Sequence, residues 1–205
     1  MSWKRRLVYA GLTFWFGGLL AAFYLVWRYK MSPGPLADAP ETWPEASVLR
    51  WSPDVANIVM FAHPQCPCTR ASLVELSRLA DELRGEAKIH VVIIHPDDTP
   101  SDFINGGIAN RTAAIPNAEL IIDHGGKEAA RFGAVVSGST VVYSRDRKLV
   151  FRGGLTTARG HEGRGPAHDR ILGAIAAKPV DRHDAPTFGC SLRQADRPIS
   201  TDHTP

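Results

Sequence analysis

Two of the three cysteines in this chain, Cys66 and Cys68, are separated by a single proline, Pro67. The pair follows the apolar run Asn57–Ala62, which is typical of a buried strand, and precedes a segment with the apolar spacing of a helix. The thiols are therefore expected at a helix N-terminus, where unpaired backbone N–H groups stabilise a thiolate and lower its pKa. A thiol pair at this position indicates redox chemistry or the binding of a soft metal ion.

The intervening proline predicts a role for each thiol. With Cys66 as the N-cap, Pro67 is the first helical residue, where its missing N–H costs nothing and its fixed φ suits the helix. Cys66 then lies closest to the free N–H groups and is the candidate nucleophile, with Cys68 as the resolving thiol. A disulfide requires Cα atoms about 4.4–6.8 Å apart, which residues two positions apart reach only in a tight turn. We therefore expect a strained bridge that acts as an oxidising or isomerising couple rather than as a strong reductant.

Two other functions fit the same residues. Two thiolates and an imidazole suit Cu(I), and His63 lies three residues before Cys66. In that interpretation His63, Cys66 and Cys68 are metal ligands, and the protein is a copper carrier or assembly factor. In a third interpretation the domain is a redox-inactive binding module. The main hypothesis, a thiol–disulfide oxidoreductase, requires no cofactor and has protein thiols and disulfides as partners.

Apolar runs and amphipathic segments alternate along the chain in the order of an α/β fold. Thr69–Arg84 has apolar residues at helical spacing with Glu75 among the charged residues between them, and Ile89–Ile94 is a second buried strand. The later predicted elements are a loose helix at Pro100–Thr112, a strand at Glu119–Asp123, a helical turn at Lys127–Phe132, a hairpin of Ser139–Ser144 and Lys148–Arg152, and a helix at His168–Lys178. This order predicts a thioredoxin-like sandwich, a central mixed sheet flanked by helices.

The segment Leu7–Trp27 contains 21 uncharged residues, which is long enough for a helix to span the roughly 30 Å apolar core of a bilayer. It is too long for the apolar part of a signal peptide, the alternative interpretation, and no small-x-small cleavage site follows it. Basic residues are more numerous before the segment than after it, which predicts a cytoplasmic N-terminus. We expect a single-pass anchor in a bacterial inner membrane, with the rest of the chain on the periplasmic or extracytoplasmic side.

The expected domain organisation follows from these segments: a cytoplasmic N-terminus at 1–6, a transmembrane helix at 7–27, a proline-rich linker at 28–46, a thioredoxin-like domain at 47–178 and a C-terminal tail at 179–205. The tail is expected to have little order apart from the stretch around Cys190. Five of the 24 Lys and Arg residues, and none of the 21 Asp and Glu residues, lie within residues 1–30. The positive charge therefore belongs to the anchor, which argues against nucleic-acid binding.

Two passages carry a resemblance to known proteins. Asp123–Ala134 followed by Gly138–Lys148 is similar to the helix-to-hairpin passage of membrane-anchored bacterial thioredoxin-like proteins, the group of the TlpA-type thiol–disulfide proteins and the peroxiredoxins. The run His-Pro-Gln-Cys-Pro-Cys-Thr-Arg at 63–70, with Ala158–Gly163 later, most resembles the small family called RedB. The resemblance implies a thioredoxin-like fold and thiol–disulfide exchange through the cysteine pair.

The chain departs from this group in two places. Thioredoxins have two residues between their cysteines, whereas Pro67 alone separates them here. The group also has a cis-proline at the start of the hairpin, facing the cysteines, and the aligned residue in this chain is Gly138, which argues against the standard docking of a substrate peptide. Peroxiredoxins have a Thr before their reactive cysteine, but Thr69 follows the pair, so a peroxidase is disfavoured.

Four further residues are candidates for supporting roles. Arg70, one turn into the helix, either lowers the thiol pKa through its charge or is a solvated helix residue. His161 and Glu162 lie in a glycine-rich loop that could approach the cysteines and shuttle protons, although a solvated loop His is the commoner outcome. Cys190 is either a third redox thiol that receives the disulfide from the Cys-Pro-Cys pair or an unpaired tail cysteine.

Overall fold

The computed structural model describes residues 3–96, 106–176 and 184–192, and the chain divides into two units, Met1–Ser32 and Pro33–Pro205. The first unit consists of helix α1 (Trp3–Lys30), which is longer at both ends than the predicted span Leu7–Trp27. Its most apolar window has a mean hydropathy of 1.6, and none of its described residues is buried. By length and composition this helix is able to cross a membrane.

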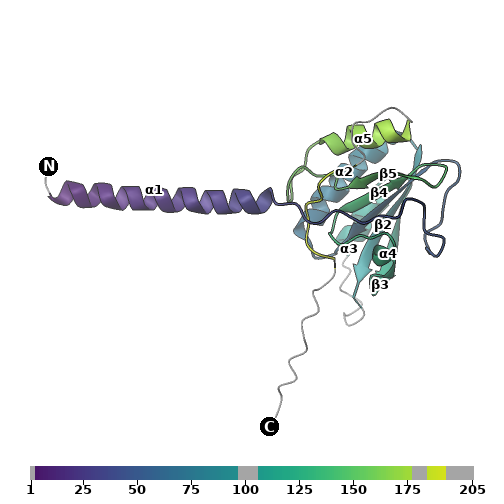
Figure 1. Ribbon diagram of the computed structural model, residues 1–205, viewed down its shortest axis with the longest axis horizontal. Helices are drawn as coiled ribbons and strands as arrows, with labels where there is room; N and C mark the ends of the chain where they lie inside the picture. Colours follow the sequence, from purple (N-terminus) through teal and green to yellow (C-terminus); the bar gives the residue numbers. More distant parts are fainter. Residues whose placement is uncertain (1–2, 97–105, 177–183, 193–205) are drawn as a thin grey trace, which may run out of the picture. The chain divides into compact units, whose positions relative to one another are not determined.

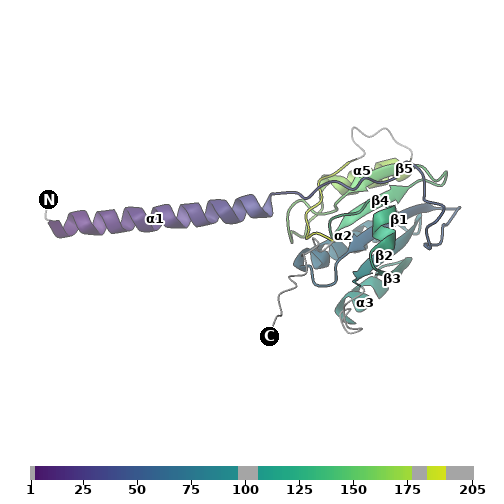
Figure 2. The same ribbon diagram turned by 60° about the horizontal axis from the view of Figure 1, so that its bottom comes forward.

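The second unit is built on one five-stranded mixed sheet with the strand order β3-β2-β1-β4-β5 (Figures 1 and 2). The strands are β1 (Ala56–Ala62), β2 (Ala87–His95), β3 (Ala118–His124), β4 (Ser139–Tyr143) and β5 (Leu149–Gly153). The first three pair in parallel, and β4 pairs antiparallel with both β1 and β5. The helices of this unit are α2 (Pro67–Leu83), α3 (Gly106–Ala113), α4 (Lys127–Arg131) and α5 (Pro166–Ile175). The predicted thioredoxin-like sandwich is confirmed.

Strand β1 is apolar throughout because both faces of the sheet are covered. Ile58 and Met60 belong to a core that also contains apolar residues of α2 and α5, such as Leu76 and Ile171. The alternate residues of β1, including Phe61, belong to a second core on the opposite face. The strand that leads into the cysteine turn is therefore fixed from both sides.

The predicted linker at 28–46 differs from the structure. Helix α1 continues through Lys30, and the remainder from Pro33 onward is part of the second unit, with Ala37 and Trp43 almost fully buried. Trp43 makes edge-to-face contacts with Phe132 and Tyr143, which lie in the second core. Helix α4 has only five residues, too few to cover this face of the sheet, so apolar residues from the proline-rich segment complete the layer.

The later elements agree with the prediction except at their ends. Helix α3 begins at Gly106, and residues 100–105 of the predicted Pro100–Thr112 helix lie outside the described residues. Helix α5 begins at Pro166 rather than His168 and ends at Ile175. In the predicted tail, residues 184–192, here called the C-terminal segment, pack on the second unit with Phe188 and Leu192 buried.

The sheet topology brings two chain segments together at one edge. Parallel strands β1, β2 and β3 end at this edge, and antiparallel β4 begins there, with Phe61 paired to Ser139. The cysteine turn after β1 therefore lies beside the residues that precede β4. Gly138 N–H donates to the carbonyl of Phe61 at 2.7 Å and joins the two segments.

Candidate thiol site

The cysteine turn has the predicted local structure. Cys66 is the N-cap of α2 with extended φ and ψ, and Pro67 is the first helical residue. The turn is closed by a hydrogen bond of 3.1 Å from Cys66 N–H to the carbonyl of His63, and Thr69 Oγ1 donates to the same carbonyl at 2.9 Å. The Cys66 side chain makes no capping hydrogen bond, so its sulfur is available for other partners.

The partner that the structure gives Cys66 is Cys190. The two Sγ atoms are 3.1 Å apart, within hydrogen-bond distance, and all three cysteines are free thiols. Cys66 and Cys68 are buried, while Cys190 is partly exposed. The stretch around Cys190 therefore belongs to the site, and the three thiols form one cluster at the N-terminus of α2.

The three thiols differ in pKa. Burial raises the pKa of Cys66, but hydrogen bonds from Cys190, from the Cys68 amide and from the Ser137 hydroxyl outweigh it and bring the pKa below its ordinary value. Burial and the neighbouring Cys66 raise the pKa of Cys68. Burial, together with the hydrogen bond to Cys66 and its charge, raises the pKa of Cys190 to about 11. Of the three thiols, Cys66 is therefore the one that loses its proton most readily.

Arg159 is a member of the site that the sequence analysis did not single out. Its charge lowers the pKa of Cys68 and of Cys190, and the Gly160 N–H bonds to Cys68 and acts in the same direction, although neither outweighs burial. Arg159 Nη1 also donates to the carbonyl of Gly189 at 2.5 Å. The only sequence signal was the position of Arg159 within Ala158–Gly163, which carried the family resemblance but no role.

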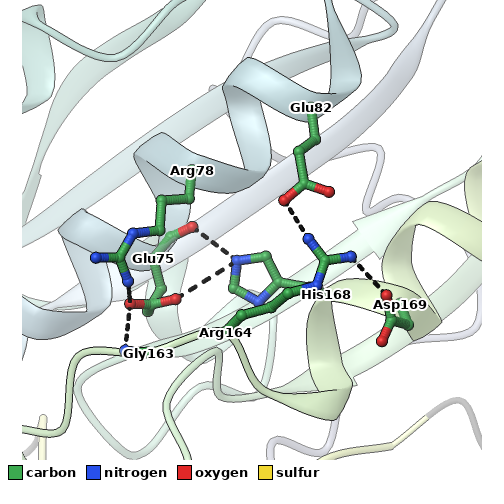
Figure 3. A network of polar contacts seen from close by, with 7 residues as sticks. All are labelled: Glu75, Arg78, Glu82, Gly163, Arg164, His168 and Asp169. Atoms are coloured by element: carbon green, nitrogen blue, oxygen red, sulfur yellow. Dashed lines mark hydrogen bonds and ion pairs between the residues drawn. The ribbon is translucent and has the colours of Figure 1, made fainter.

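A buried carboxylate fastens this loop to helix α2 (Figure 3). Glu75 Oε1 accepts the Gly163 N–H at 2.7 Å and forms an ion pair with Arg78. His168 of α5 lies beside Glu75, with Nε2 3.2 Å from the Glu75 carbonyl and 3.6 Å from its carboxylate. Arg164 extends the connection by pairing with both Glu82 and Asp169.

The placement of Glu75 corrects the sequence analysis, which put it on the polar face of the helix. Its side chain is 0% exposed. It lies seven residues, or about two helical turns, after Cys68, and therefore on the same face of α2. That spacing was the signal that could have found it. Its carboxylate replaces the water that the Gly163 N–H would otherwise require.

The predicted supporting residues of the loop lie elsewhere. Arg70 pairs with Glu162 at 3.8 Å, and both side chains are well exposed. His161 is also exposed, and a Cβ on Gly163 would lie 3.3 Å from its ring. Within the described part of the chain, the arginine whose charge acts on the thiols is Arg159, and Arg70, His161 and Glu162 do not contribute to the pKa of any of the three cysteines.

Ser137 and Gly138 form the opposite wall of the site. Ser137 Oγ accepts the His63 N–H at 3.0 Å and lies 3.0 Å from Thr69 Oγ1, which ties the wall to the cysteine turn. Gly138 has φ +92°, and a Cβ there would lie 2.9 Å from the Ser72 hydroxyl. A proline at 138 could not donate to Phe61, so a glycine at this position has its own structural reason.

The copper alternative rests on His63, Cys66 and Cys68. Burial lowers the pKa of His63, and its Nδ1 accepts the Gln65 N–H at 3.2 Å. Within residues 3–96, 106–176 and 184–192, no three His, Cys, Asp or Glu side chains are grouped to hold a metal ion. Copper binding therefore stays a prediction that only a binding experiment tests.

Known proteins resemble this chain in fold. No protein-family model and no curated protein sequence matches it. An uncharacterized conserved protein from Geobacillus kaustophilus is 20% identical with a TM-score of 0.59, over 82% of this chain and 93% of that one. A hypothetical protein from Sinorhizobium meliloti 1021 is 19% identical with a TM-score of 0.57, over 70% of this chain and 81% of that one.

A third solved structure is a secreted Mycobacterium tuberculosis disulfide oxidoreductase homologous to E. coli DsbE. It is 18% identical with a TM-score of 0.41, over 60% of this chain and 82% of that one. The first two of these likenesses, with TM-scores of 0.59 and 0.57, show the fold alone. The activity must therefore be argued from the thiol cluster.

Proposed function

We propose that this chain is a membrane-tethered thiol–disulfide oxidoreductase that works outside the cytoplasm through the couple Cys66-Pro67-Cys68. The observation that carries the proposal is the thiol cluster itself, with Cys66 at the N-terminus of α2 and the Cys190 sulfur 3.1 Å from the Cys66 sulfur. A buried structural cysteine packs as a small apolar group and keeps its proton. Cys66 is instead surrounded by donors that favour the thiolate, which is the form that reacts.

The same donors favour an oxidising role. A stabilised thiolate stabilises the reduced protein, which raises the reduction potential of the couple. In the proposed step a substrate thiolate attacks Cys66 Sγ of the Cys66–Cys68 disulfide, forms a mixed disulfide and releases Cys68, which takes a proton. A second substrate thiolate then attacks the substrate sulfur of the mixed disulfide and releases Cys66. The substrate is oxidised to a disulfide, the protein is reduced to the dithiol, and a partner disulfide reoxidises it.

The proposed location follows from α1, which has the length and composition of a membrane-spanning helix. The basic residues before its apolar stretch favour a cytoplasmic N-terminus, and an oxidising compartment outside the cytoplasm allows the disulfide to persist. The resemblance to the RedB family rests on the cysteine turn and the loop Ala158–Gly163. The structure adds a contact between them, because Gly160 N–H bonds to Cys68.

A redox titration of the full-length chain in detergent tests the proposal. The protein is equilibrated with mixtures of reduced and oxidised glutathione, its thiols are alkylated, and the oxidised fraction is measured by mass. We expect a reversible two-electron transition at a potential clearly above that of thioredoxin, about −270 mV. A potential at or below that value would contradict the oxidising role, and no transition would contradict the proposed activity.

The copper alternative is tested on the same protein. The reduced chain and its Cys66→Ser variant are incubated anaerobically with Cu(I) and analysed by native mass spectrometry. A thiol–disulfide oxidoreductase should retain no stoichiometric copper against a competing chelator. One bound Cu(I), lost in the variant and accompanied by no reversible oxidation, would replace the proposed function with a copper carrier.

A further inference from the structure

The C-terminal segment, residues 184–192, reaches the thiol site through isolated β-bridges, of which Ser191 to Val136 is antiparallel. Ser137 N–H donates to the Cys190 carbonyl at 2.8 Å, and Leu192 N–H donates to the Val135 carbonyl at 2.9 Å. On its other side, the Thr187 carbonyl of the segment accepts a hydrogen bond of 2.8 Å from the Gly34 N–H. It is thus held by backbone bonds on both sides, directly beside the residues that precede β4.

The fit of this segment requires a glycine next to the thiol. A Cβ on Gly189 would lie 1.9 Å from the Ser137 carbonyl oxygen, so the backbone approaches more closely than any other residue permits. Arg159 binds the Gly189 carbonyl from the loop, and the buried Phe188 and Leu192 anchor the segment on either side. These contacts place Cys190 Sγ 3.1 Å from Cys66 Sγ.

We propose that Cys190 takes over the disulfide from the Cys-Pro-Cys couple, so that the resting oxidised protein contains a Cys66–Cys190 bridge. This inference rests on the proposed thiol–disulfide activity and names the internal partner of that same site. In the step, the Cys190 thiolate attacks Cys66 Sγ of the Cys66–Cys68 disulfide. The Cys66–Cys190 bond forms, the Cys66–Cys68 bond breaks, and the Cys190 proton passes to Cys68, so the exchange needs no external oxidant or reductant.

The direction of this exchange follows from geometry. The Cys66–Cys68 bridge joins residues two positions apart across a helical proline, a separation that only a tight turn allows. The Cys66–Cys190 bridge joins two chain segments that packing already holds together, and strained bridges are the more oxidising ones. Once Cys66 is in a disulfide, its charge no longer raises the pKa of Cys190, while Arg159 still lowers it. The departing Cys68 thiolate is stabilised by a hydrogen bond from the Gly160 N–H and by the charge of Arg159.

Disulfide mapping of the full-length oxidised chain in detergent tests the inference. After oxidation with glutathione disulfide and blocking of free thiols, peptide mass spectrometry quantifies each bridge. We expect Cys66–Cys190 to exceed Cys66–Cys68 by at least about tenfold, the ratio given by 30 mV between the two couples. Cys68→Ser should keep the Cys66–Cys190 bridge, and Cys190→Ser should shift the protein to Cys66–Cys68.

A matched control moves the thiol by one residue. Combining Cys190→Ser with Ser191→Cys keeps the composition of the segment, but successive side chains of an extended strand point to opposite sides. This variant should form no long-range bridge. A wild-type protein with Cys66–Cys68 as its main bridge would overturn the inference and leave the proposed function intact, whereas a protein without any bridge would overturn the proposed function. Equal long-range bridging in the control would show that the bridge comes from a loose tail rather than from the docked segment.

Discussion

Cys68 and Cys190 are both neighbours of Cys66, but they belong to regions that reach it in different ways. The cysteine turn holds Cys68 two residues away at a helix N-terminus, where Pro67 fixes the backbone. The C-terminal segment brings Cys190 from 124 residues away by backbone hydrogen bonds and buried anchors. The first arrangement exists wherever α2 forms, whereas the second exists only when the whole domain is folded. Cys66 therefore has one neighbouring thiol from its own turn and one from a distant segment, and the proposed short and long-range disulfides would share its sulfur.

The largest effect is expected from the substitution that removes the Cys66 sulfur. Cys66→Ser should reduce the rate at which the oxidised chain introduces a disulfide into a model dithiol peptide by at least about a hundredfold, because the covalent intermediate cannot form. Cys68→Ser and Cys190→Ser, measured in the same assay, should each retain part of the activity because each leaves Cys66 a partner. Equal rates for all three variants would contradict the central role of Cys66.

The two couples should differ in what oxidation does to stability. A Cys66–Cys190 bridge closes a loop that spans 124 residues, and chain entropy alone predicts about 5 kcal/mol of stabilisation. For a chain of this size that corresponds to a Tm increase of roughly 10 °C or more. Oxidised Cys190→Ser, restricted to the short bridge, should gain only a small part of it. Differential scanning calorimetry of both proteins with and without a reductant measures the difference.

Replacing Glu75 should lower the stability of the protein by loosening the loop that is bound to helix α2. Glu75→Ala removes the buried carboxylate that binds the Gly163 N–H and Arg78 and leaves a partly buried donor without its acceptor, at a cost of about 3 kcal/mol. Glu82→Ala, one position in the same network but 36% exposed, is the matched control and should change stability by less than about 1 kcal/mol. Urea unfolding of the reduced proteins measures both. Equal costs would contradict the loop-anchoring role of Glu75.

Replacing Gly189 should weaken the packing of the C-terminal segment. Gly189→Ala places a Cβ against the Ser137 carbonyl and should displace the segment, at a cost of roughly 1–3 kcal/mol. Hydrogen exchange at the Ser137 and Leu192 amides, which bond to the segment or belong to it, should become faster. Cys190→Ser, which keeps the glycine, should leave these amides protected. Unchanged protection in Gly189→Ala would show that the segment is not held by this close contact.

The smallest expected effect is a difference between Cys66 and Cys190 in the pH at which each thiol becomes reactive. Alkylation requires the thiolate, so its rate rises with pH through the pKa of each group. The midpoint for Cys66 should lie below the ordinary thiol value, because donors favour its thiolate, and that for Cys190 should lie near pH 11. Rates of iodoacetamide labelling at each residue, followed by mass spectrometry in the reduced protein, measure the two midpoints. A lower midpoint for Cys190 would reverse the assignment of the nucleophile.

Local signals were sufficient for the cysteine turn and for most elements of the fold. The apolar run of β1, the N-cap Cys66 and the first-turn Pro67 depend on residues close in sequence, and the structure confirms them. The burial of Glu75 and of Trp43 was missed, because the partners that retain them, Gly163 and the aromatic cluster, are far away in the chain.

Distance along the chain also explains why the residues that surround the thiols could not be predicted. Ser137 and Arg159 have no distinctive local pattern, and they act on the thiols only because the sheet and the loop carry them there. Cys190 was recognised as a candidate from its chemistry alone. Its position 3.1 Å from Cys66 depends on packing that no periodicity in the sequence describes.

The pairing of the C-terminal segment with Val135 and Ser137 also bears on solubility. Backbone N–H and C=O groups without partners at the edge of a folded domain are templates on which another chain can add a strand. While residues 184–192 are docked, these groups are satisfied within the chain, and Gly34 is paired as well. Truncation before Asp184 would expose all three positions together. The segment that presents a thiol to Cys66 thus also pairs backbone groups of three other residues, Gly34, Val135 and Ser137.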